Sequence, residues 1–238
     1  LFAELKGLRE RKTTDEWLEF AKETAIEHPL CAAIHREPMV SRSFEKPRGY
    51  AGDAKLIDYI YRVRTPDDVD EDVRRAYDCC TTARPASLAV QTRRRVIARA
   101  LDGLMERPRG QRRALAVACG HLREVELSRA VDEGEIDEIV ALDSDPVSLA
   151  QARRDYEHLP VTWVHASITR LIRDRDRESY DLVYSSGLYD YLEDRIASKL
   201  TTCLFERLRP GGKLVICNFV PQIYDAGFME SYMGWDLI

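Results

Sequence analysis

The amino-acid sequence predicts an α/β fold in which a mostly parallel sheet follows an all-helical N-terminal segment. After residue 110, short apolar runs alternate with helical patterns, and this alternation is typical of parallel strands connected by helices. Before residue 110, apolar residues recur at helical spacing and no strong strand pattern occurs. We therefore expect two parts in the 238-residue chain, a helical segment over 1–110 and an α/β core over 111–238.

The N-terminal segment carries several helix-start signals. Thr13 and Glu16 have the spacing of a capping box, in which each side chain bonds the other residue's backbone N–H. Asp53 stands before a second apolar helical stripe, where a carboxylate caps the first turn. Pro66 and Pro85 are placed where a proline opens a helix, and the helix from Pro85 is predicted to be long.

The second part is predicted to contain five strands separated by four helices. The expected strands cover 114–119, 138–142, 161–165, 182–185 and 213–219. The expected helices cover 122–132, 146–157, 167–175 and 191–209. In such sheets ligands bind beyond the carboxyl ends of the strands, so these ends are where chemistry is expected.

Charge and composition exclude several functions. The 36 basic and 41 acidic residues leave a net charge of −5, which argues against a nucleic-acid partner. We interpret the run Arg93-Arg94-Arg95 as a solvated helix face. No apolar stretch approaches about 18 residues, so no membrane span is expected. The six cysteines include no Cys-x-x-Cys pair, which predicts no metal site and a reducing, cytoplasmic location.

Two strand ends carry groups suited to a nucleoside. Gly120 follows the first strand, where a glycine lets the backbone approach a ligand closely. Asp143 ends the second strand, where a carboxylate can accept hydrogen bonds from both hydroxyls of a ribose. The dinucleotide fingerprint needs three glycines and only Gly120 is present, so pyrophosphate binding is disfavoured. The two ends together predict an adenosine-type ligand without a pyrophosphate.

Four motifs together resemble the class I S-adenosylmethionine-dependent methyltransferases. They are the Gly120 turn, the strand-end Asp143, Tyr180-Asp181-Leu182-Val183-Tyr184 and Leu208-Arg209-Pro210-Gly211-Gly212-Lys213-Leu214. The resemblance covers residues 113–238 and implies a Rossmann-like core that binds S-adenosyl-L-methionine. The sequence departs from that family at Ala116, where an acid is usual, and at Ala118 and Leu122, where glycines are usual.

A narrower resemblance spans both parts of the chain. The shared blocks are Lys46-Pro47-Arg48-Gly49-Tyr50-Ala51-Gly52-Asp53, Ser186-Gly187-Leu188-Tyr189-Asp190-Tyr191, Asn218-Phe219-Val220-Pro221 and Trp235-Asp236-Leu237-Ile238. They are similar to bacterial methyltransferases for the biosynthesis of 3-hydroxypalmitic acid methyl ester. This resemblance implies one functional unit and a small-molecule acceptor with a carboxylate or hydroxyl group. The class I fold normally has seven strands, so we expect Trp235–Ile238 to begin a sixth and the natural chain to continue.

The resemblance also implies roles for individual residues. The expected cofactor-binding residues are Arg48, Tyr50, Ala118, Gly120, Asp143, Ser144, Ala166, Ser167, Ser186 and Gly187. Tyr189 and Asp190 are the candidate catalytic residues, and Asn218, Tyr224 and Trp235 are candidates for binding the acceptor. We expect His165 to be a core histidine and His121 to shape the cofactor turn.

Methyl transfer from a sulfonium requires that water be excluded, and the open edge of a parallel sheet cannot do this alone. We therefore expect the N-terminal segment to act as a lid, with Arg48 and Tyr50 facing the cofactor. Two other functions stay open, a catalytically silent methyltransferase-like scaffold and a nucleotide-binding oxidoreductase. The expected partner is a small-molecule methyl acceptor, with no nucleic acid, and a homodimer is left open.

Overall fold

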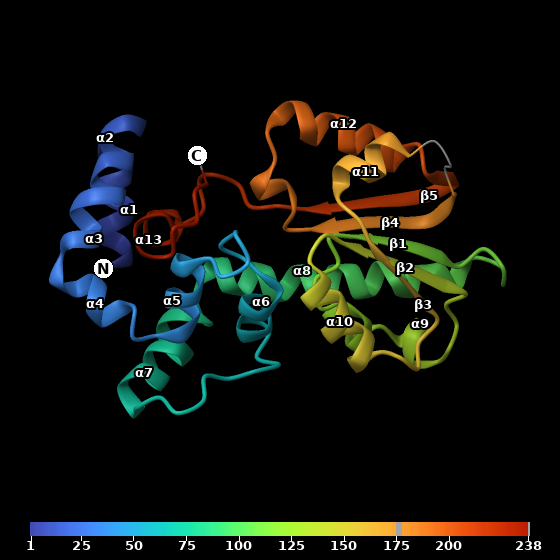
Figure 1. The fold of residues 1–238 in the computed structure, drawn as a ribbon, viewed down its shortest axis with the longest axis horizontal. Helices are drawn as coiled ribbons and strands as arrows, with labels where there is room; N and C mark the ends of the chain where they lie inside the picture. Colours follow the sequence, from blue (N-terminus) through green and yellow to red (C-terminus); the bar gives the residue numbers. More distant parts are fainter. Residues whose placement is uncertain (175–177, 238) are drawn as a thin grey trace. The chain divides into compact units, whose positions relative to one another are not determined.

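The computed structural model describes residues 1–174 and 178–237, which form two compact units (Figure 1). The first unit contains Leu1–Gln91 and Phe219–Ile238, and the second contains Thr92–Asn218. These junctions differ from the division expected at residues 110 and 111. The second half of the long helix belongs with the sheet, and the C-terminal residues belong with the N-terminal helices.

The regular elements in the described part of the first unit are all helices, joined by loops. Its helices are α1(Phe2–Arg11), α2(Thr14–Glu19), α3(Ala25–Glu27), α4(Pro29–Ile34), α5(Pro38–Glu45), α6(Ala54–Ile60), α7(Glu71–Arg75), the start of α8(Pro85–Asp102) and α13(Ala226–Tyr232), with π-helical turns at Phe20–Thr24 and Ala76–Thr81. The capping box of Thr13 and Glu16 is confirmed, and Asp53 caps α6 by accepting from the Leu56 N–H at 2.9 Å. The helix start predicted at Pro66 is wrong. Asp70 caps α7 instead, because its carboxylate accepts from the Val73 N–H.

The core of the first unit joins both ends of its chain. Trp17, Met39 and Leu56 are buried in one apolar cluster with Phe228 and Trp235. The sixth strand predicted from Trp235 is therefore wrong for residues 235–237, which form no strand, while Ile238 lies outside the described residues. Burying the Trp235 ring among helices stabilises this stretch without a strand partner.

The second unit is a parallel sheet with the strand order β3-β2-β1-β4-β5. Its strands are β1(Arg113–Val117), β2(Glu138–Asp143), β3(Val161–His165), β4(Tyr180–Ser186) and β5(Leu208–Cys217). Its other helices are α9(Arg129–Asp132), α10(Pro146–Asp155), α11(Ile168–Arg173) and α12(Asp194–Phe205), with 3₁₀ turns at Gly103–Glu106, Arg123–Leu127 and Tyr189–Tyr191. The predicted α/β class and its five strands are confirmed. Only the last position of the helix expected over 167–175 lies outside the described residues.

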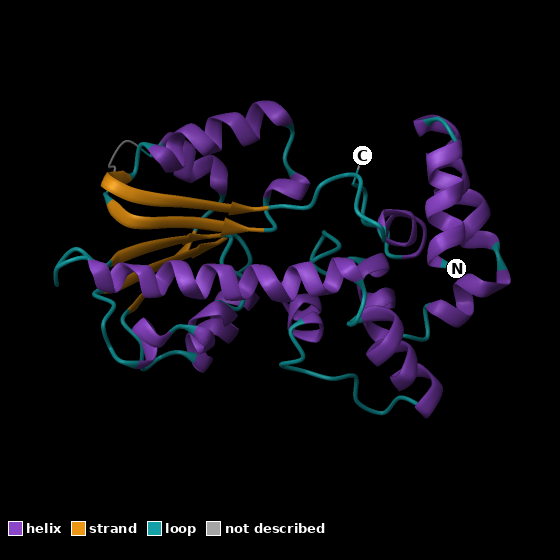
Figure 2. Cartoon of the chain, turned by 180° about the vertical axis from the view of Figure 1, so that it is seen from behind, coloured by secondary structure: helices purple, strands orange, loops and turns teal. Residues whose placement is uncertain are grey.

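Helices cover both faces of this sheet (Figure 2). Ala114 and Ala116 of β1 face an apolar cluster formed with α8, α9 and α10. Leu115 and Val117 face the opposite cluster, formed with α11 and α12. Because successive side chains alternate across a strand, β1 is buried on both faces, as its continuous apolar sequence predicts.

The strand register aligns the carboxyl ends of the five strands. Val117 pairs with Leu142 on one side and with Ser185 on the other, and Asp143 pairs with His165. On the far side, Ser186 pairs with Cys217. The chain order reverses between β1 and β4, so this edge is the topological switch point at which such sheets bind ligands.

One predicted helix in this unit begins differently. The segment 122–132 starts with a 3₁₀ turn over Arg123–Leu127 and becomes α-helical only at Arg129. Leu122 stands before that turn in the left-handed region, with φ 54°. The chain therefore leaves the left-handed position through a short 3₁₀ turn before the α-helix begins, as is common at helix N-termini.

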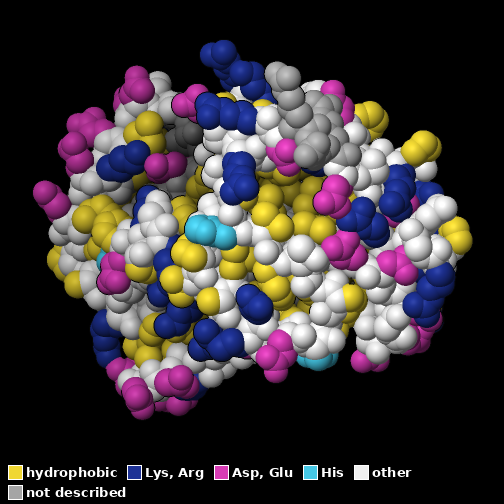
Figure 3. Space-filling model, turned by 45° about the vertical axis from the view of Figure 1, so that its right-hand side comes forward, with side chains coloured by type: hydrophobic (Ala, Val, Ile, Leu, Met, Phe, Trp, Pro, Cys, Tyr) yellow, Lys and Arg dark blue, Asp and Glu magenta, His cyan; other side chains and the backbone are white. Residues whose placement is uncertain are grey.

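The charges on the surface drawn in Figure 3 are of both signs and lie interspersed. This mixture matches the near balance of 36 basic and 41 acidic residues. A single-sign field of the kind that attracts nucleic acid does not form on this face. Within the described part of the chain, no helix combines the length and apolar character that spanning a bilayer requires.

Candidate cofactor site at the strand ends

The turn after β1 has an unusual backbone. Ala118, Gly120 and Leu122 all adopt a φ of 54°, in the left-handed region. For the two residues with a Cβ this conformation costs about 1–2 kcal/mol each. The turn therefore keeps a glycine-type path although two of its residues are not glycine. The buried side chain of Leu122 fixes that path, since it is only 1% exposed.

Asp143 ties this turn to the end of β2. One carboxylate oxygen accepts from the Gly120 N–H at 2.8 Å, and the other accepts from the Asp145 N–H at 2.8 Å. Burial raises the pKa of Asp143, while the two backbone N–H groups act in the opposite direction. Each carboxylate oxygen retains a second lone pair, so both can still accept from a ligand hydroxyl.

The other predicted residues beyond β2 and β3 have mixed surroundings. Ser144 is exposed, and its carbonyl oxygen lies 3.2 Å from Nε2 of His165. Ala166 is buried and donates its N–H to the Asp143 carbonyl, while Ser167 caps α11. The expectation that His165 is a core residue is wrong, because this side chain is exposed at the end of the edge strand β3. An edge strand has neighbours on one side only and leaves its end open to solvent.

The turn after β4 contains the two candidate catalytic residues. Gly187 has a φ of 85°, and its N–H bonds the Cys217 carbonyl at 2.9 Å. Ser186 precedes it, and the Ser186 Oγ is buried with no hydrogen-bond partner among the described residues. Tyr189 and Asp190 lie in the following 3₁₀ turn, both half-buried, and the Tyr189 hydroxyl lies 3.0 Å from Thr201 Oγ1. Burial raises the pKa of Tyr189, so its phenol stays protonated at neutral pH.

The structure also places Arg93 at this turn, which the sequence analysis missed. A Cβ added to Gly187 would lie 2.7 Å from Nη1 of Arg93. Arg94 is buried and bonds the Arg123 carbonyl and Glu126, so among the three arginines only Arg95 is exposed. The interpretation of this run as a solvated face is therefore wrong for Arg93 and Arg94. A signal existed in the sequence, because Arg93 shares a helical stripe with Ile97 and Leu101.

A buried polar cluster lies beside Arg93. Glu124 is 8% exposed, and burial raises its pKa. The Tyr184 hydroxyl faces the Glu124 carboxylate but reaches no hydrogen-bonding geometry. Cys119 is next to both groups, and burial raises the pKa of its thiol, so the thiol stays protonated. None of these residues was predicted to belong to the site, and each one reads as an ordinary core or surface position in the sequence.

The other predicted residues divide between the two units. Asn218 ends the second unit and is exposed, while Arg48, Tyr50, Tyr224 and Trp235 belong to the first unit. Arg48 and Tyr50 lie half-buried in the loop between α5 and α6, so their assignment to the cofactor stays a prediction.

Tyr224 stands 40% exposed under the Arg84 guanidinium. Trp235 lines an apolar cavity of about 30 Å³ with Met39 and Phe219. Over residues 1–174 and 178–237, no group of three or more His, Cys, Asp or Glu side chains is arranged to hold a metal.

Comparison with known proteins points to one family for the sheet unit. Residues 114–212 match the methyltransferase domain family. No curated protein matches the chain. Among solved structures, a possible exported protein from Bordetella parapertussis has a similar fold, with 20% identity, coverage of 87% of this chain and 72% of that chain, and a TM-score of 0.55.

Two further structures match a smaller share. DesVI from Streptomyces venezuelae is 20% identical over 64% of this chain and 59% of its own, with a TM-score of 0.43. CalS10, an amino pentose methyltransferase from Micromonospora echinaspora, is 16% identical over 67% of this chain and 61% of its own, with a TM-score of 0.44. The chain thus spans less than two thirds of the length of these two proteins.

Proposed function

Residues 114–212 match the methyltransferase domain family and form a parallel sheet with a topological switch point, and we propose that the protein is a class I enzyme that transfers the methyl group of S-adenosylmethionine to a small-molecule acceptor. The main support for this proposal is the carboxylate of Asp143, which joins the Gly120 turn to the end of β2 at the switch point. It keeps free lone pairs for the two hydroxyls of a ribose. A first turn with a single glycine suits an adenosine without a pyrophosphate, because the dinucleotide fingerprint needs three.

Methyl transfer is a direct displacement in which the nucleophile, the methyl group and the sulfur must be aligned. The protein's contribution is therefore positioning and the exclusion of water. A carboxylate acceptor is already ionised at pH 7 and needs no base, whereas a hydroxyl acceptor benefits from one. We assign Asp190 as that base for a hydroxyl acceptor. The protonated Tyr189 phenol then orients the acceptor by a hydrogen bond.

The acceptor that we propose is a fatty-acid-like molecule with a carboxylate or hydroxyl group, for which 3-hydroxypalmitic acid is the first compound to test. Arg48 and Tyr50 are proposed to complete the cofactor site, with Asn218, Tyr224 and Trp235 contributing to acceptor binding. A cytoplasmic location and the choice between monomer and homodimer stay predictions.

Binding of the demethylated cofactor tests the role of Asp143. Asp143→Ala should weaken S-adenosylhomocysteine by about 1.5–3 kcal/mol, roughly ten- to hundredfold, because it removes a charged acceptor of two hydroxyls. The matched control is Asp145→Ala, since Asp145 caps α10 through the Val147 N–H and its side chain takes no part in the ribose contact. Isothermal titration calorimetry measures both variants. Equal affinity of the Asp143→Ala protein and the wild type would rule the assignment out.

Transfer of a labelled methyl group tests the reaction itself. With 3-hydroxypalmitic acid as acceptor, mass spectrometry distinguishes an ester from an ether product. If the hydroxyl is methylated, Asp190→Asn should lower kcat by about 10²- to 10⁴-fold, and if the carboxylate is methylated, kcat should change little.

Tyr50→Ala should lower the turnover number markedly while it changes the melting temperature little. Tight cofactor binding with no transfer to any acceptor would favour the silent scaffold, and binding of NAD in its place would favour the oxidoreductase.

A further inference from the structure

The guanidinium of Arg93 stands at the turn after β4 and forms neither a hydrogen bond nor an ion pair with the described residues. We propose that this guanidinium binds a carboxylate of the methyl acceptor, and that the acceptor is a hydroxy acid that is methylated on its hydroxyl group. The inference rests on the proposed function, because it selects the acceptor and the methylated group of that reaction.

Arg93 has the features of a side chain whose anionic partner is a ligand. Its Nε is buried and has no hydrogen-bond partner in the described part of the chain. A guanidinium carries only donors, so it requires an acceptor. A buried donor without an acceptor is unfavourable, and one carboxylate can accept from two N–H groups of a guanidinium at once.

Gly187 allows the guanidinium to come close to the end of β4. A Cβ added to Gly187 would lie 2.7 Å from Nη1 and 3.1 Å from Nη2 of Arg93. A larger residue at this position would therefore displace the guanidinium, and the φ of 85° independently favours glycine. The glycine thus serves both the turn and the approach of Arg93.

The neighbouring arginine shows what a structural role looks like on this helix. Arg94 bonds the Arg123 carbonyl at 2.9 Å and forms an ion pair with Glu126. Its donors find acceptors inside the protein, whereas those of Arg93 find none among the described residues. The two residues are adjacent in sequence and differ in the face of α8 that they occupy.

Arg93 lies on the side of the site that we assign to the acceptor. Gly187, which it contacts, belongs to the turn that leads into the two candidate catalytic residues. The charge of Arg93 also acts on the Cys217 thiol at the end of β5, against the rise in pKa that burial causes there. Asp143, which we assign to the ribose, ends β2, and β1 lies between β2 and β4. The guanidinium therefore stands across β1 from the ribose position.

A carboxylate held by Arg93 is a poor methyl acceptor. Its oxygen lone pairs are engaged by the N–H groups, and the neighbouring positive charge stabilises the ionised form and lowers its basicity. A hydroxyl group elsewhere in the same molecule keeps its lone pairs. The pairing therefore favours an ether product over an ester.

The transfer is a single displacement in which all atoms are accounted for. The hydroxyl oxygen forms a bond to the methyl carbon while the bond between that carbon and the sulfonium sulfur breaks. The electron pair of the broken bond stays on the sulfur, and the hydroxyl proton passes to the Asp190 carboxylate. The product is a methyl ether whose carboxylate is still held by Arg93.

Hydroxy acids and their methyl esters test the proposal on the wild-type protein, because each pair shares the hydroxyl and differs in the carboxylate charge. The probes are 3-hydroxybutyric, 3-hydroxydecanoic and 3-hydroxypalmitic acid, with S-adenosylmethionine that carries a labelled methyl group. We expect at least one acid to be converted to a methyl ether with a free carboxylate, identified by mass spectrometry. Its methyl ester should react with a kcat/KM about ten- to hundredfold lower.

The other outcomes contradict the proposal. Conversion of an acid to its ester, equal kcat/KM for an acid and its ester, or no methylation of any of the three acids would each overturn it. Calorimetry with S-adenosylhomocysteine separates this failure from a failure of the proposed function. Binding of that ligand leaves the methyltransferase assignment in place, whereas no binding would overturn that assignment as well.

Variants assign the carboxylate to its residue. Arg93→Met should raise KM for the acid about ten- to hundredfold and leave both the KM for the methyl ester and the affinity for S-adenosylhomocysteine unchanged. Arg95→Met, at an exposed position on the same helix, is the matched control and should behave like the wild type. Weaker binding of S-adenosylhomocysteine by Arg93→Met would place the cofactor at this guanidinium and contradict the proposal.

An equal rise of KM for the acid and the ester in Arg93→Met would show a structural role and also contradict the proposal. If Arg93→Met does not fold, Arg93→Lys serves instead, because it keeps the charge but not the planar fork. That variant should raise KM for the acid selectively, and an unselective rise or no change would again count against the proposal.

Discussion

At the scale of single residues, position on a helix face decides what a charge does. Arg93, Arg94 and Arg95 are identical and consecutive, yet the first faces the turn after β4, the second is paired inside the protein and the third is exposed. Successive residues on a helix point about 100° apart, so a run of three necessarily divides among different surroundings. The sequence of a charge run therefore does not determine the surroundings of each side chain, which depend on how the helix packs against the sheet.

Glu124 leads to a prediction about pH. Burial raises its pKa from an ordinary value of 4.5, although Arg94 and Arg93 act in the opposite direction. The other titratable groups around it are Cys119, Tyr184 and Cys217. Because the folded protein holds this proton more tightly than the unfolded chain, stability without ligand falls as pH rises from about 4.5 through the raised pKa.

Glu124→Gln removes that dependence, since the amide does not ionise. The variant should be more stable than the wild type at pH 8, by about 1.4 kcal/mol for each unit by which the pKa is raised. The difference should shrink to near zero at pH 4, where both side chains are neutral. Urea unfolding of the ligand-free protein across this pH range measures it, with the exposed Glu157→Gln as control. A constant difference at all pH values would contradict the prediction.

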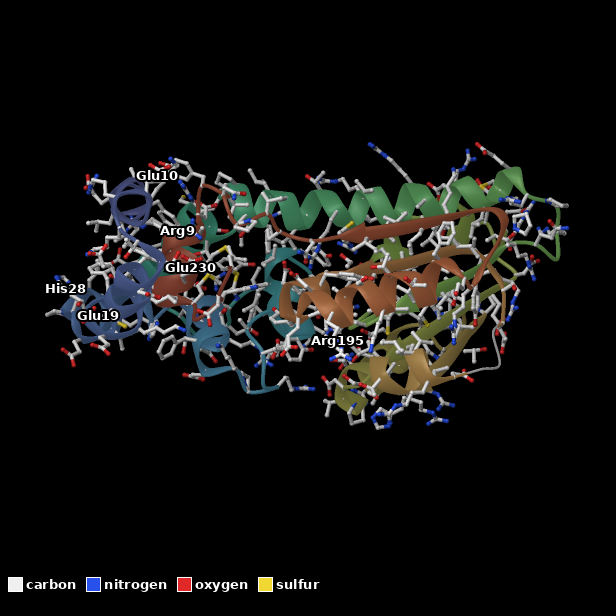
Figure 4. All side chains as sticks on the ribbon, turned by 90° about the horizontal axis from the view of Figure 1, so that it is seen from above. Arg9, Glu10, Glu19, His28, Arg195 and Glu230 are labelled. Carbon is white, nitrogen blue, oxygen red and sulfur yellow. The ribbon has the colours of Figure 1, made fainter. Side chains whose placement is uncertain are left out.

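At the scale of elements, a buried ion pair joins the two ends of the first unit. Glu230 of α13 accepts from Arg9 of α1 at 2.7 and 3.0 Å (Figure 4). It also accepts from Nε1 of Trp17 in α2 at 2.6 Å. Glu230 is 3% exposed, so these three bonds satisfy a carboxylate that water does not reach. The helix α13 is thereby fixed to the N-terminal helices by a polar contact inside an apolar cluster.

Glu230→Ala should destabilise the first unit by about 3–5 kcal/mol, because it leaves the Arg9 guanidinium and the Trp17 indole N–H without an acceptor. The control is Glu10→Ala on the same helix as Arg9, since Glu10 forms an exposed pair with Lys6 and should contribute less than about 1 kcal/mol. Thermal unfolding followed by tryptophan fluorescence measures both changes. A loss no larger than that of the control would show that the buried pair is not a stabilising contact.

At the scale of the whole molecule, the two units follow different rules of construction. The second unit is continuous in sequence, and its strands and helices alternate along the chain. The first unit combines the N-terminal helices with the last residues of the chain, and a salt bridge between Arg84 and Asp225 links the two segments. The carboxylate oxygen of Asp225 that does not bond Arg84 accepts from the backbone N–H of Ala86, at the start of α8.

This construction explains which predictions succeeded. The five strands, the helix caps at Thr13 and Asp53, and the placement of Asp143 at a strand end are all confirmed. They depend on periodicity and on hydrogen bonds between residues a few positions apart. Such signals are complete within a short window of sequence, so no knowledge of the rest of the fold is needed to read them.

Only the tertiary structure decided where Arg93, Glu124, Trp235 and His165 stand relative to solvent. Arg93 and Glu124 are separated in sequence, and the guanidinium acts on the carboxylate electrostatically because α8 packs against the face of β1 and β4. Trp235 enters a helical core instead of a strand, and His165 is exposed because β3 is an edge. Burial depends on the partners that the rest of the chain brings, and these partners are distant in sequence. Local propensity determined the elements of this protein, and the packing between them determined which charges remain available to a ligand.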